Sequence, residues 1–381
     1  MFDLADLLAR LQVLSDRRCP KGLRYPLGQA LLLLVLAKLA GYDQPSAIAD
    51  WISARGRPLR QALGLSWRRM PHHNTWRRIL AEAISPAELE GAVGAYLASL
   101  PGVGRSVLVA IDGKTVRGTI SAANPRGEHL LAAYLPAEGV VLMQVAVGGK
   151  ANEIVAAPHL LGCMDLRGKV VAADAMHTQR ALSLQILQAG GDYLWLAKEN
   201  QPALRQAIGQ VFAADWGTVA GGTVPHDLRT AHTVDKGHGR LERRRISVSS
   251  ELAGCSDWPG LEQVFVVRRE RVDRRTRKKE RETVYGLTSL SPARADAGHL
   301  LGLVRAYWGI ENGLHQRRDI TFREDRTRLT KGRAGWVMAA LNNLVISLFS
   351  LAGATNVAAA RRHADATITL SLMQDYARSL T

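Results

Sequence analysis

The sequence predicts an α/β fold: a mixed sheet with helices on both faces, a helical segment before it and a β-rich insertion within it. Three features carry this prediction. Residues 1 to about 100 have helical periodicity with short breaks, β-branched runs alternate with helical stretches from residue 106 onward, and residues 202–290 turn mostly β. Three strands followed by alternating helix and strand are typical of such a sheet.

Composition favours a negatively charged partner. The 381 residues include 50 lysines and arginines against 34 acids, so the formal net charge is +16. The length allows two or three domains, and 47% hydrophobic residues suit a folded globular chain. The positive surplus indicates a polyanion, but it does not separate nucleic acid from anionic membrane or ribosome.

The three cysteines, Cys19, Cys163 and Cys255, are scattered and form no CxxC pair. This argues against a disulfide framework or a zinc ribbon and suits a reducing compartment. The strongly apolar stretch 30–37 ends at Lys38 and is shorter than the roughly 20 residues that a membrane span needs. With no signal-peptide pattern either, we expect a cytoplasmic protein with no membrane partner.

The helical N-terminal segment contains a strongly basic tract. Residues 28–39 are apolar on most sides and predict a buried helix that ends at Gly41. Residues 51–80 then hold seven arginines and no carboxylate. Asn74 is suited to cap a helix that carries Arg77 and Arg78 in its first turn. A solvated helix face is one interpretation; phosphate contact is the one we favour.

Residues 106–201 alternate between strand and helix signals. Apolar, β-branched runs predict strands, and longer periodic stretches predict helices. The expected strands are 106–111, 129–135, 140–147, 169–173 and 192–197, and the expected helices are 153–163 and 178–189. The Pro136–Gly139 segment is a natural hairpin turn between the second and third strands.

The remaining sequence predicts a β insertion and then helices. Segments 263–267 and 283–287 are typical of a hairpin, and residues 268–281 between them include nine basic and three acidic residues. A long helix is expected from about Ala295 to Gln316, and residues 335–381 are again helical.

Two aspartates follow apolar strands. Asp112 comes after 106–111, and Asp174 comes after 169–173. Open α/β sheets place ligand chemistry at the carboxyl ends of their strands. A lone aspartate at such a place is often only a turn or cap residue, but two of them on one strand pattern indicate a site.

A third acid, Glu311, interrupts an apolar helix stripe. With helical spacing, one face of the 295–316 helix and its extension carries Leu300, Val304, Tyr307, Glu311, Leu314 and Arg318. A carboxylate on the buried side has to be paired, protonated or bound to metal. A salt bridge to an arginine is the simpler interpretation, and a metal site shared with the two aspartates is the one we favour.

Three carboxylates suit phosphodiester chemistry. Two Mg²⁺ ions bound by oxygen ligands activate the attacking oxygen and stabilise the leaving one, and Mn²⁺ is expected to substitute. Water attacks first and exposes a 3′-OH, which then attacks a second DNA site. The sequence has no GxSxG elbow and no P-loop, so a hydrolase triad and an NTPase have no support.

The chain resembles the insertion-sequence transposases of the H-repeat-associated (ISAs-type) family, which use an Asp-Asp-Glu trio. The resemblance covers nearly the whole chain. The matching stretches are Asp112-Gly-Lys-Thr-Val-Arg-Gly, Asn152-Glu-Ile, Ala173-Asp-Ala-Met-His-Thr-Gln, Lys198-Glu-Asn-Gln, Gly237-His-Gly-Arg-Leu-Glu-Arg-Arg and Tyr307-Trp-Gly-Ile-Glu-Asn-Gly-Leu-His. Near the N-terminus, the stretch that begins at Asp16 and the tetrapeptide Ile48-Ala-Asp-Trp look like the accessory domain of this family.

The resemblance implies an RNase H-like catalytic domain and a DNA transposase. Asp112, Asp174 and Glu311 become the catalytic, metal-binding trio. The partner becomes double-stranded DNA, namely the terminal repeats of the element and its target, in a bacterial, nucleoid-associated setting. Pairing of two ends implies a homodimer or a larger assembly. The expected organisation is an accessory domain at 1–100, catalytic core at 101–201 and 291–350, a β insertion at 202–290 and a helical tail at 351–381.

The sequence departs from its relatives on the glutamate helix. Related transposases often carry Tyr, Arg, Glu and Lys there, with the last three placed three, seven and fourteen positions after the tyrosine. The corresponding residues are Val304, Tyr307, Glu311 and Arg318, so only the final basic residue survives, as arginine. Arg305 and Arg317 are candidates to position a phosphate in place of the missing signature residues. Glu324 or Asp325 is the second candidate for the third acid.

Other residues have weaker assignments. The expected DNA contacts are Lys114, Lys198, Asn200, His238, Arg240 and Arg318, besides Arg77 and Arg78. Turn-forming roles are the alternative for Lys198, Asn200, His238 and Arg240. His177 is expected to form local hydrogen bonds rather than to touch DNA, and Trp308 to lie in the core rather than to stack on a base. Glu153 either starts a helix or pairs with a lysine of the site.

Two other functions remain open on sequence grounds. One is a DNA-binding relative whose chemistry has decayed or been repurposed. The other is an RNase H-like nuclease that cleaves DNA without joining strands. Mg²⁺-dependent nicking separates the first from a transposase, and joining of a cut 3′ end to a second duplex separates the second.

Overall fold

The computed structural model of the chain describes residues 3–21, 23–148, 152–213, 225–237 and 239–378. It contains two compact units. Unit 1 comprises Met1–Arg105, Gly113–Asn152 and Glu311–Thr381, and unit 2 comprises Ser106–Asp112 and Glu153–Ile310. The first hundred residues thus share a unit with the C-terminal helices, a grouping that cuts across the five consecutive segments expected from the sequence.

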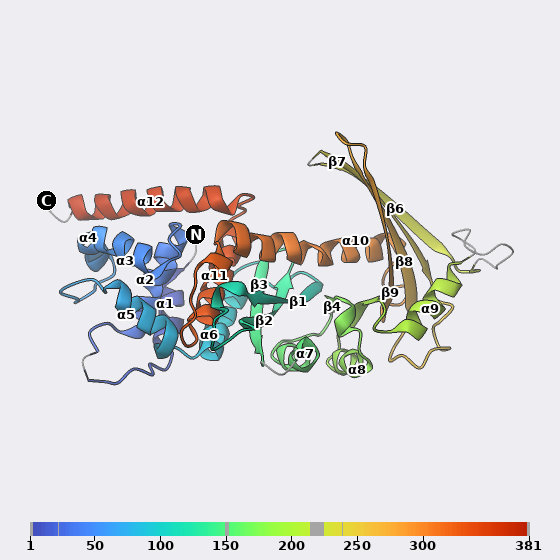
Figure 1. Cartoon of the computed structure of the whole chain (residues 1–381), viewed down its shortest axis with the longest axis horizontal. Coiled ribbons are helices and arrows are strands. Elements are labelled where there is room, and N and C mark those ends of the chain that lie inside the picture. Colours follow the sequence, from blue (N-terminus) through green and yellow to red (C-terminus); the bar gives the residue numbers. More distant parts are fainter. Residues whose placement is uncertain (1–2, 22, 149–151, 214–224, 238, 379–381) are drawn as a thin grey trace. The chain divides into compact units, whose positions relative to one another are not determined.

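Unit 1 is mainly helical and is built around two apolar helices, α2 (Leu27–Leu39) and α11 (Ala334–Leu351), which contact each other (Figure 1). As predicted, α2 is buried on nearly every side. Gly41 follows it with a φ of 100°, a conformation that side chains disfavour, so the helix ends there. The other helices of unit 1 are α1 (Leu4–Gln12), α3 (Pro45–Ala54), α4 (Gly56–Ala62), α5 (His73–Arg78), η1 (Ile79–Ala83), α6 (Pro86–Ser99), η2 (Arg117–Thr119), η4 (Glu311–His315), η5 (Arg317–Thr321), η6 (Glu324–Arg326) and α12 (Val357–Arg378).

A cluster of buried charged side chains links α12 to the end of α2. The Lys38 ammonium lies 2.9 Å from Asp43 Oδ1, and Arg361 of α12 donates to both oxygens of the same carboxylate at 2.8 Å. Burial lowers the pKa of Lys38, while Asp43 opposes that change. Because an unpaired buried charge is costly, these partners hold the two helices together. The C-terminal helix is therefore part of the core packing of unit 1.

Helix α11 is long and apolar enough to cross a membrane by length and composition alone, with a mean hydropathy of 1.6 over 18 residues. It is the one helix of the described residues that passes this test, and 83% of it is buried inside the structure. It is longer than the apolar stretch 30–37, on which the expectation of no membrane span was based. Burial of this extent is typical of the core helix of a folded domain.

The strands of unit 1 form an antiparallel meander. Strand β2 (Glu128–Leu135) pairs antiparallel with β3 (Val140–Val147), and Gly139 adopts a φ of 69° in the turn between them, as the sequence predicted. In the sheet, β2 lies between β3 and β1 (Leu108–Val116). Helices α6 and α11 pack on β3.

Unit 2 carries the larger part of the sheet, in the order β1-β4-β5-β9-β8-β7-β6. Strands β1, β4 and β5 are parallel, and the remaining pairs are antiparallel. These elements are β4 (Val170–Ala173), β5 (Asp192–Ala197), β6 (Arg229–Gly237), β7 (Arg240–Ser249), β8 (Gln263–Asp273) and β9 (Lys279–Thr288), with α7 (Glu153–Gly162), η3 (Ala175–His177), α8 (Arg180–Gln188), α9 (Pro202–Val211) and α10 (Ala297–Tyr307). The mixed α/β fold predicted from the sequence is confirmed.

Strand β1 extends further than predicted. Its first four residues, Leu108–Ile111, are buried, and pairing continues through Asp112 to Val116. Asp112 is therefore inside a strand rather than just after one. The sequence pattern ended at Ile111 because the continuation Asp-Gly-Lys-Thr is polar and only partly buried, which removes the hydrophobic signal.

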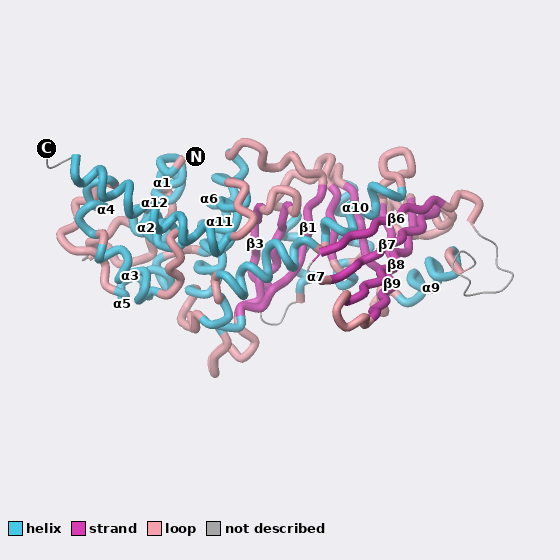
Figure 2. The backbone as a smooth tube through the Cα atoms, turned by 90° about the horizontal axis from the view of Figure 1, so that it is seen from above, coloured by secondary structure: helices cyan, strands magenta, loops and turns pink. Residues whose placement is uncertain are grey.

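The β-rich insertion is a four-stranded antiparallel sheet, β6 to β9, that joins the parallel strands through the β5–β9 pair (Figure 2). The pairing between β8 and β9 runs without interruption from Gln263↔Thr288 to Val272↔Lys279. Both strands are thus longer than the predicted hairpin, and the basic stretch 268–281 forms their ends and turn. Helix α10 packs on β6 and β7.

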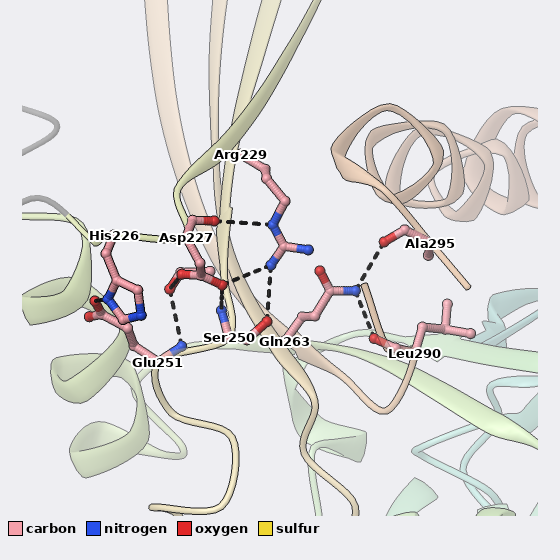
Figure 3. A network of polar contacts seen from close by, with 9 residues as sticks. His226, Asp227, Arg229, Ser250, Glu251, Gln263, Leu290 and Ala295 are labelled. Carbon is pink, nitrogen blue, oxygen red and sulfur yellow. Dashed lines mark hydrogen bonds and ion pairs between the residues drawn. The ribbon is translucent and has the colours of Figure 1, made fainter. Parts of the chain in front are cut away.

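A polar network holds the base of this insertion (Figure 3). Asp227 accepts hydrogen bonds from Ser249 Oγ at 2.6 Å and from the Ser250 amide at 2.7 Å, and Arg229 donates to it at 3.1 Å. At the start of β8, Gln263 Nε2 donates to the carbonyls of Leu290 and Ala295. These bonds fix where the strands leave the rest of unit 2.

Candidate active site

Asp112 and Asp174 lie on neighbouring parallel strands of unit 2. The register pairs Leu108 with Val170 and Ala110 with Ala172. Asp112 and Asp174 each follow the last of these pairs by two residues, and neighbouring strands are about 4.8 Å apart. Both carboxylates are partly exposed. A shared site of these two acids stays a prediction, and β1 does not end at Asp112.

The backbone after Asp174 is shaped by the aspartate itself. Strand β4 ends at Ala173, and Asp174 Oδ1 accepts a hydrogen bond from the Met176 amide at 2.9 Å, which starts the short helix η3. Such N-terminal capping fixes the direction of the carboxylate. A cap role and a ligand role are compatible, because the carboxylate has a second oxygen.

His177, at the end of η3, is buried, with 1% of its surface exposed. Its Nε2 lies 3.0 Å from Oε2 of Glu153, the first residue of α7. This geometry agrees with a local hydrogen-bonding role for His177 and gives Glu153 a histidine partner. The pair links α7 to the turn that carries Asp174.

The loop after β5 is tied to the same turn. Asn200 Nδ2 donates to the Ala175 carbonyl, and Gln201 Nε2 donates to the Thr178 carbonyl at 2.9 Å. Asn200 thus has a structural bond in this unit, in line with the alternative role weighed for it. Lys198 is exposed at the end of β5, and its contact with DNA stays a prediction.

Glu311 is exposed, contrary to the stripe prediction. Helix α10 ends at Tyr307, and residues 311–315 form a π-helical turn, η4. A π turn spans more residues than an α turn, so the side chains after it no longer follow the α-helical stripe. Leu300, Val304 and Leu314 are buried as predicted, whereas the Glu311 side chain is 71% exposed.

The surroundings of Glu311 in unit 1 are polar and mostly positive. His315 Nδ1 lies 3.6 Å from Glu311 Oε2. The pKa of Glu311 is lowered, first by its interaction with His315 and to a smaller extent by the charge of Lys114. The Lys114 ammonium is 2.6 Å from Asp319 Oδ1 and only 10% of its side chain is exposed. Lys114 therefore forms an internal ion pair in this structure, which is a correction to its assignment as a DNA contact.

Arg318 also differs from the prediction. Its side chain is fully buried, and its Nε donates to Glu324 Oε2 at 2.8 Å. Asn342 of α11 donates to the other oxygen of Glu324 at 2.8 Å. Arg318 therefore braces the interior of unit 1 and is not placed to touch DNA. The π-helical segment η5 turns it inward.

These contacts also bear on the alternative third acids. Glu324 is 1% exposed and neutralised by Arg318. Asp325 Oδ1 accepts a hydrogen bond from the Arg117 amide at 2.9 Å. Both carboxylates have structural partners, so Glu311 remains the better candidate. His315 and Asp319 were missed by the sequence analysis, although His315, four residues after Glu311, lies at a spacing that brings helical side chains together.

The basic N-terminal tract is partly structural and partly exposed. Arg77 and Arg78 are exposed on α5, whose cap is His72 rather than Asn74, because His72 Nδ1 accepts from the Asn74 amide. Arg55 is different, since it pairs with Asp365 of α12 at 3.2 Å. A cavity of about 740 Å³ lies beside α5, and the cations that line it are Arg17, Arg18, Lys21, Arg24, Arg69 and Arg78.

Three further assignments fall on the insertion and α10. Arg240 is exposed at the first position of β7, and His238 lies outside the described residues. Trp308 is partly buried, and the Arg269 guanidinium lies 5.1 Å from its ring centre. The tryptophan therefore stacks on an arginine of its own unit, in line with a structural role.

The chain has a mixed α/β sheet with one aspartate on β1 and another directly after β4. The transposase DDE domain family matches residues 104–348, and the DDE_Tnp_1-associated family matches residues 8–97. The chain belongs to the transposase DDE domain family. This confirms the resemblance and places the associated domain where the accessory segment was expected.

The chain is similar to several individual proteins. The chain is 28% identical over 354 residues to "H repeat-associated putative transposase YhhI" of Escherichia coli, covering 92% of this chain and 91% of that one. It is 34% identical over 262 residues to an uncharacterized protein of Xanthobacter autotrophicus, covering 68% of this chain and 85% of that one. A piggyBac transposase synaptic complex with hairpin DNA aligns with 9% identity and a TM-score of 0.45 over 99% of this chain and 82% of that one.

Proposed function

We propose that this protein is a DNA transposase that cleaves the ends of an insertion sequence and joins the resulting 3′-OH to target DNA. The observation that carries the proposal is the register of β1 and β4, which supports a carboxylate pair formed by Asp112 and Asp174. Family membership supports the same chemistry. Glu311 is proposed as the third carboxylate.

The inclusion of Glu311 is supported from within unit 1. Its carboxylate is exposed, ionised more readily than usual, and set on a π-helical turn. Turns of this kind occur frequently at functional sites. Lys114 influences its charge, and Lys114 follows Asp112 by two residues on the same strand. These features support Glu311 as a functional carboxylate.

The donor set fits divalent magnesium. Two carboxylates side by side repel each other unless a cation or a proton is shared between them, and carboxylate oxygens are the ligands that Mg²⁺ prefers. Asp112, Asp174 and Glu311 would hold the ions, which when bound supply charge stabilisation to the attacking and leaving oxygens. Mn²⁺ is expected to replace Mg²⁺.

The proposed reaction has two steps, and each step forms one bond to phosphorus and breaks another. In the first, a water oxygen bonds to phosphorus and the bond from phosphorus to the 3′ oxygen breaks, which leaves a 3′-OH and a 5′ phosphate. In the second, that 3′ oxygen bonds to a phosphorus of the target strand while the target P–O3′ bond breaks. The total number of phosphodiester bonds is unchanged in the second step, so the protein needs to position groups rather than supply energy.

The test uses the full chain, Mg²⁺ and labelled duplexes of the terminal repeats that flank its own gene. We expect nicking at the element end and a joined product with a second duplex. Asp112→Asn, Asp174→Asn and Glu311→Gln should each remove cleavage and leave binding measurable. Asp165→Asn is the matched control, because this exposed carboxylate of unit 2 pairs only with a neighbouring arginine in the same loop.

The outcomes separate the alternatives. Binding without any Mg²⁺-dependent cleavage would support a decayed DNA-binding relative. Cleavage without a joined product would support a nuclease. Full activity of Glu311→Gln would remove Glu311 from the site while leaving the aspartate pair. We also propose at least a dimer in the DNA complex, which light scattering of the protein mixed with end duplex tests directly.

A further inference from the structure

The strand register divides the insertion sheet into two faces with different charge. Residues directly paired across antiparallel strands lie on the same face, and successive residues alternate between faces. One row of pairs joins His232, Arg245, Arg268 and Thr283, and the next on that face joins Val234, Arg243, Glu270 and Arg281. A third row joins Lys236, Leu241, Val272 and Lys279.

This first face, here named the basic face, holds six lysines and arginines and one acid. The cations are Lys236, Arg243, Arg245, Arg268, Lys279 and Arg281, and the acid is Glu270. All six cationic residues are exposed, with side chains of Arg243 and Arg281 at 61% and 78%. Four of the six are arginines, whose planar fork suits phosphate oxygens.

The opposite face, here named the paired face, is nearly neutral. Its charged residues on the four strands are five arginines and five acids: Arg229, Arg240, Arg244, Arg269, Arg271, Asp235, Glu242, Asp273, Glu280 and Glu282. Arg244 pairs with Asp235 and Glu242 at 2.6 Å, and Arg271 pairs with Glu280 at 3.6 Å. Helix α10 covers this face, since its Arg305 lies 2.9 Å from Asp235.

The basic face is also hollowed. A concavity of about 710 Å³ is lined by all eight residues of its first two rows and by Thr233, Arg244, Arg269 and Glu282 of the row between them, and no residue of α10 lines it. At the end of the sheet, the turn between β8 and β9 continues the positive charge with Arg274, Arg275, Arg277 and Lys278, all exposed. The Arg274 amide donates to the Gly239 carbonyl, so the two hairpin turns lie together.

We propose that the basic face of the β6–β9 sheet is a second DNA-binding surface, which holds the phosphate backbone of duplex DNA. The inference rests on the proposed transposase function and specifies which side of the insertion meets the DNA. A surface several strands wide, dense in arginine and concave, fits a polyanionic double helix. A membrane is the less suitable partner, because the turn that ends the sheet carries no apolar side chain to insert.

The inference changes the assignment of the 268–281 tract. Arg268, Lys279 and Arg281 face the DNA, whereas Arg269 and Arg271 serve the paired face. Arg243 and Arg245, which precede the tract by more than twenty residues, join the surface through the register. Substitutions in the tract should therefore affect DNA binding according to the face and not according to position in the sequence.

The experiment measures binding of a terminal-repeat duplex by fluorescence anisotropy, in EDTA so that cleavage is absent, across salt from about 50 to 200 mM. The variant Arg245→Gln/Arg268→Gln/Arg281→Gln removes three charges from the basic face. We expect the slope of log affinity against log salt to become shallower by about 0.9 for each lost phosphate contact, and affinity to fall at least about tenfold.

The matched control is Arg167→Gln/Arg180→Gln/Arg205→Gln, which removes the same charge from exposed side chains of unit 2 outside the insertion strands. Its salt slope should equal that of the parent. An equal loss of slope in both variants, or none in the first, overturns the proposal, and circular dichroism checks that both variants fold. The face would be reassigned to membranes if the basic-face variant alone lost binding to phosphatidylserine vesicles while the salt dependence of its DNA affinity stayed that of the parent.

This outcome is independent of the proposed function. If the basic-face variant loses salt slope while the parent never cleaves DNA in Mg²⁺, the surface stands and the enzymatic role fails. If the parent cleaves and the variant keeps its slope, the enzymatic role stands and the surface fails.

Discussion

His177 lies three residues after Asp174, and its Nε2 atom is 3.0 Å from Oε2 of Glu153. Helix α7 thus holds the η3 turn in place through a partner outside the strand that carries the aspartate. Histidines and carboxylates behind a metal ligand commonly orient it. We therefore expect Glu153 and His177 to help orient Asp174.

We expect Glu153→Gln to lower cleavage about 10- to 100-fold, as is usual when a positioning partner of a ligand is lost. The Mg²⁺ concentration needed for half-maximal activity should rise in the same variant, which a purely structural role would not cause. Glu153→Asp should restore part of the activity. Glu199→Gln is the control, because Glu199 is 82% exposed and pairs with Arg205. An unchanged Mg²⁺ dependence in Glu153→Gln would contradict the assignment.

Divalent metal should stabilise the folded protein. Ligand binding to the native state alone raises the free energy of unfolding, by about 1.4 kcal/mol at ten times the dissociation constant. We therefore expect Mg²⁺ to raise the Tm by roughly 2 °C or more in a thermal scan. Asp174→Asn should lose this increase, whereas Asp165→Asn should keep it. A full increase in the Asp174 variant would mean that the metal binds elsewhere.

The buried Arg318–Glu324 pair should contribute strongly to the stability of unit 1. The two side chains are 0% and 2% exposed, so removal of one partner leaves a buried charge. Arg318→Met should lower the free energy of unfolding by about 3–5 kcal/mol, measured by urea denaturation. The exposed Arg167–Asp165 pair is the comparison, and Arg167→Met should cost less than about 1 kcal/mol. The double variant Arg318→Met/Glu324→Gln should recover part of the lost free energy of unfolding. Equal losses in Arg318→Met and Arg167→Met would contradict the prediction.

Glu90 should make stability depend on pH. Burial raises its pKa from 4.5 to about 8, partly opposed by a 2.6 Å hydrogen bond from Gln144. The folded protein thus keeps a proton that the unfolded chain releases, so stability falls as pH rises from 4.5 to about 8. Glu90→Gln should remove this slope of about 1.4 kcal/mol per pH unit.

The measurement is the free energy of unfolding of Glu90→Gln and of the parent at several pH values across this range. The difference between the two should grow steadily in favour of the variant as the pH rises. A difference that stays constant with pH would show that Glu90 is ionised in the folded state.

Part of this architecture can be predicted from local sequence. Strands β2, β3 and β5 and helix α2 lie within a residue or so of their predicted bounds, because each is a continuous apolar run that has only one way to become buried. That Asp112 and Asp174 lie close together is a prediction from the same pattern. Two buried parallel strands bring the residues that follow them to one edge of a sheet.

The sequence by itself determined the family and the mixed sheet, and the site role of the two aspartates stays a prediction. Only the tertiary structure decided the directions of Glu311 and Arg318, because helical spacing assumes one regular period and the π turns at residues 311–321 change it. It also decided which arginines of the insertion share a face, since that depends on the pairing register of strands far apart in sequence. Periodicity is a local property, whereas register and changes of helical period arise when distant segments pack.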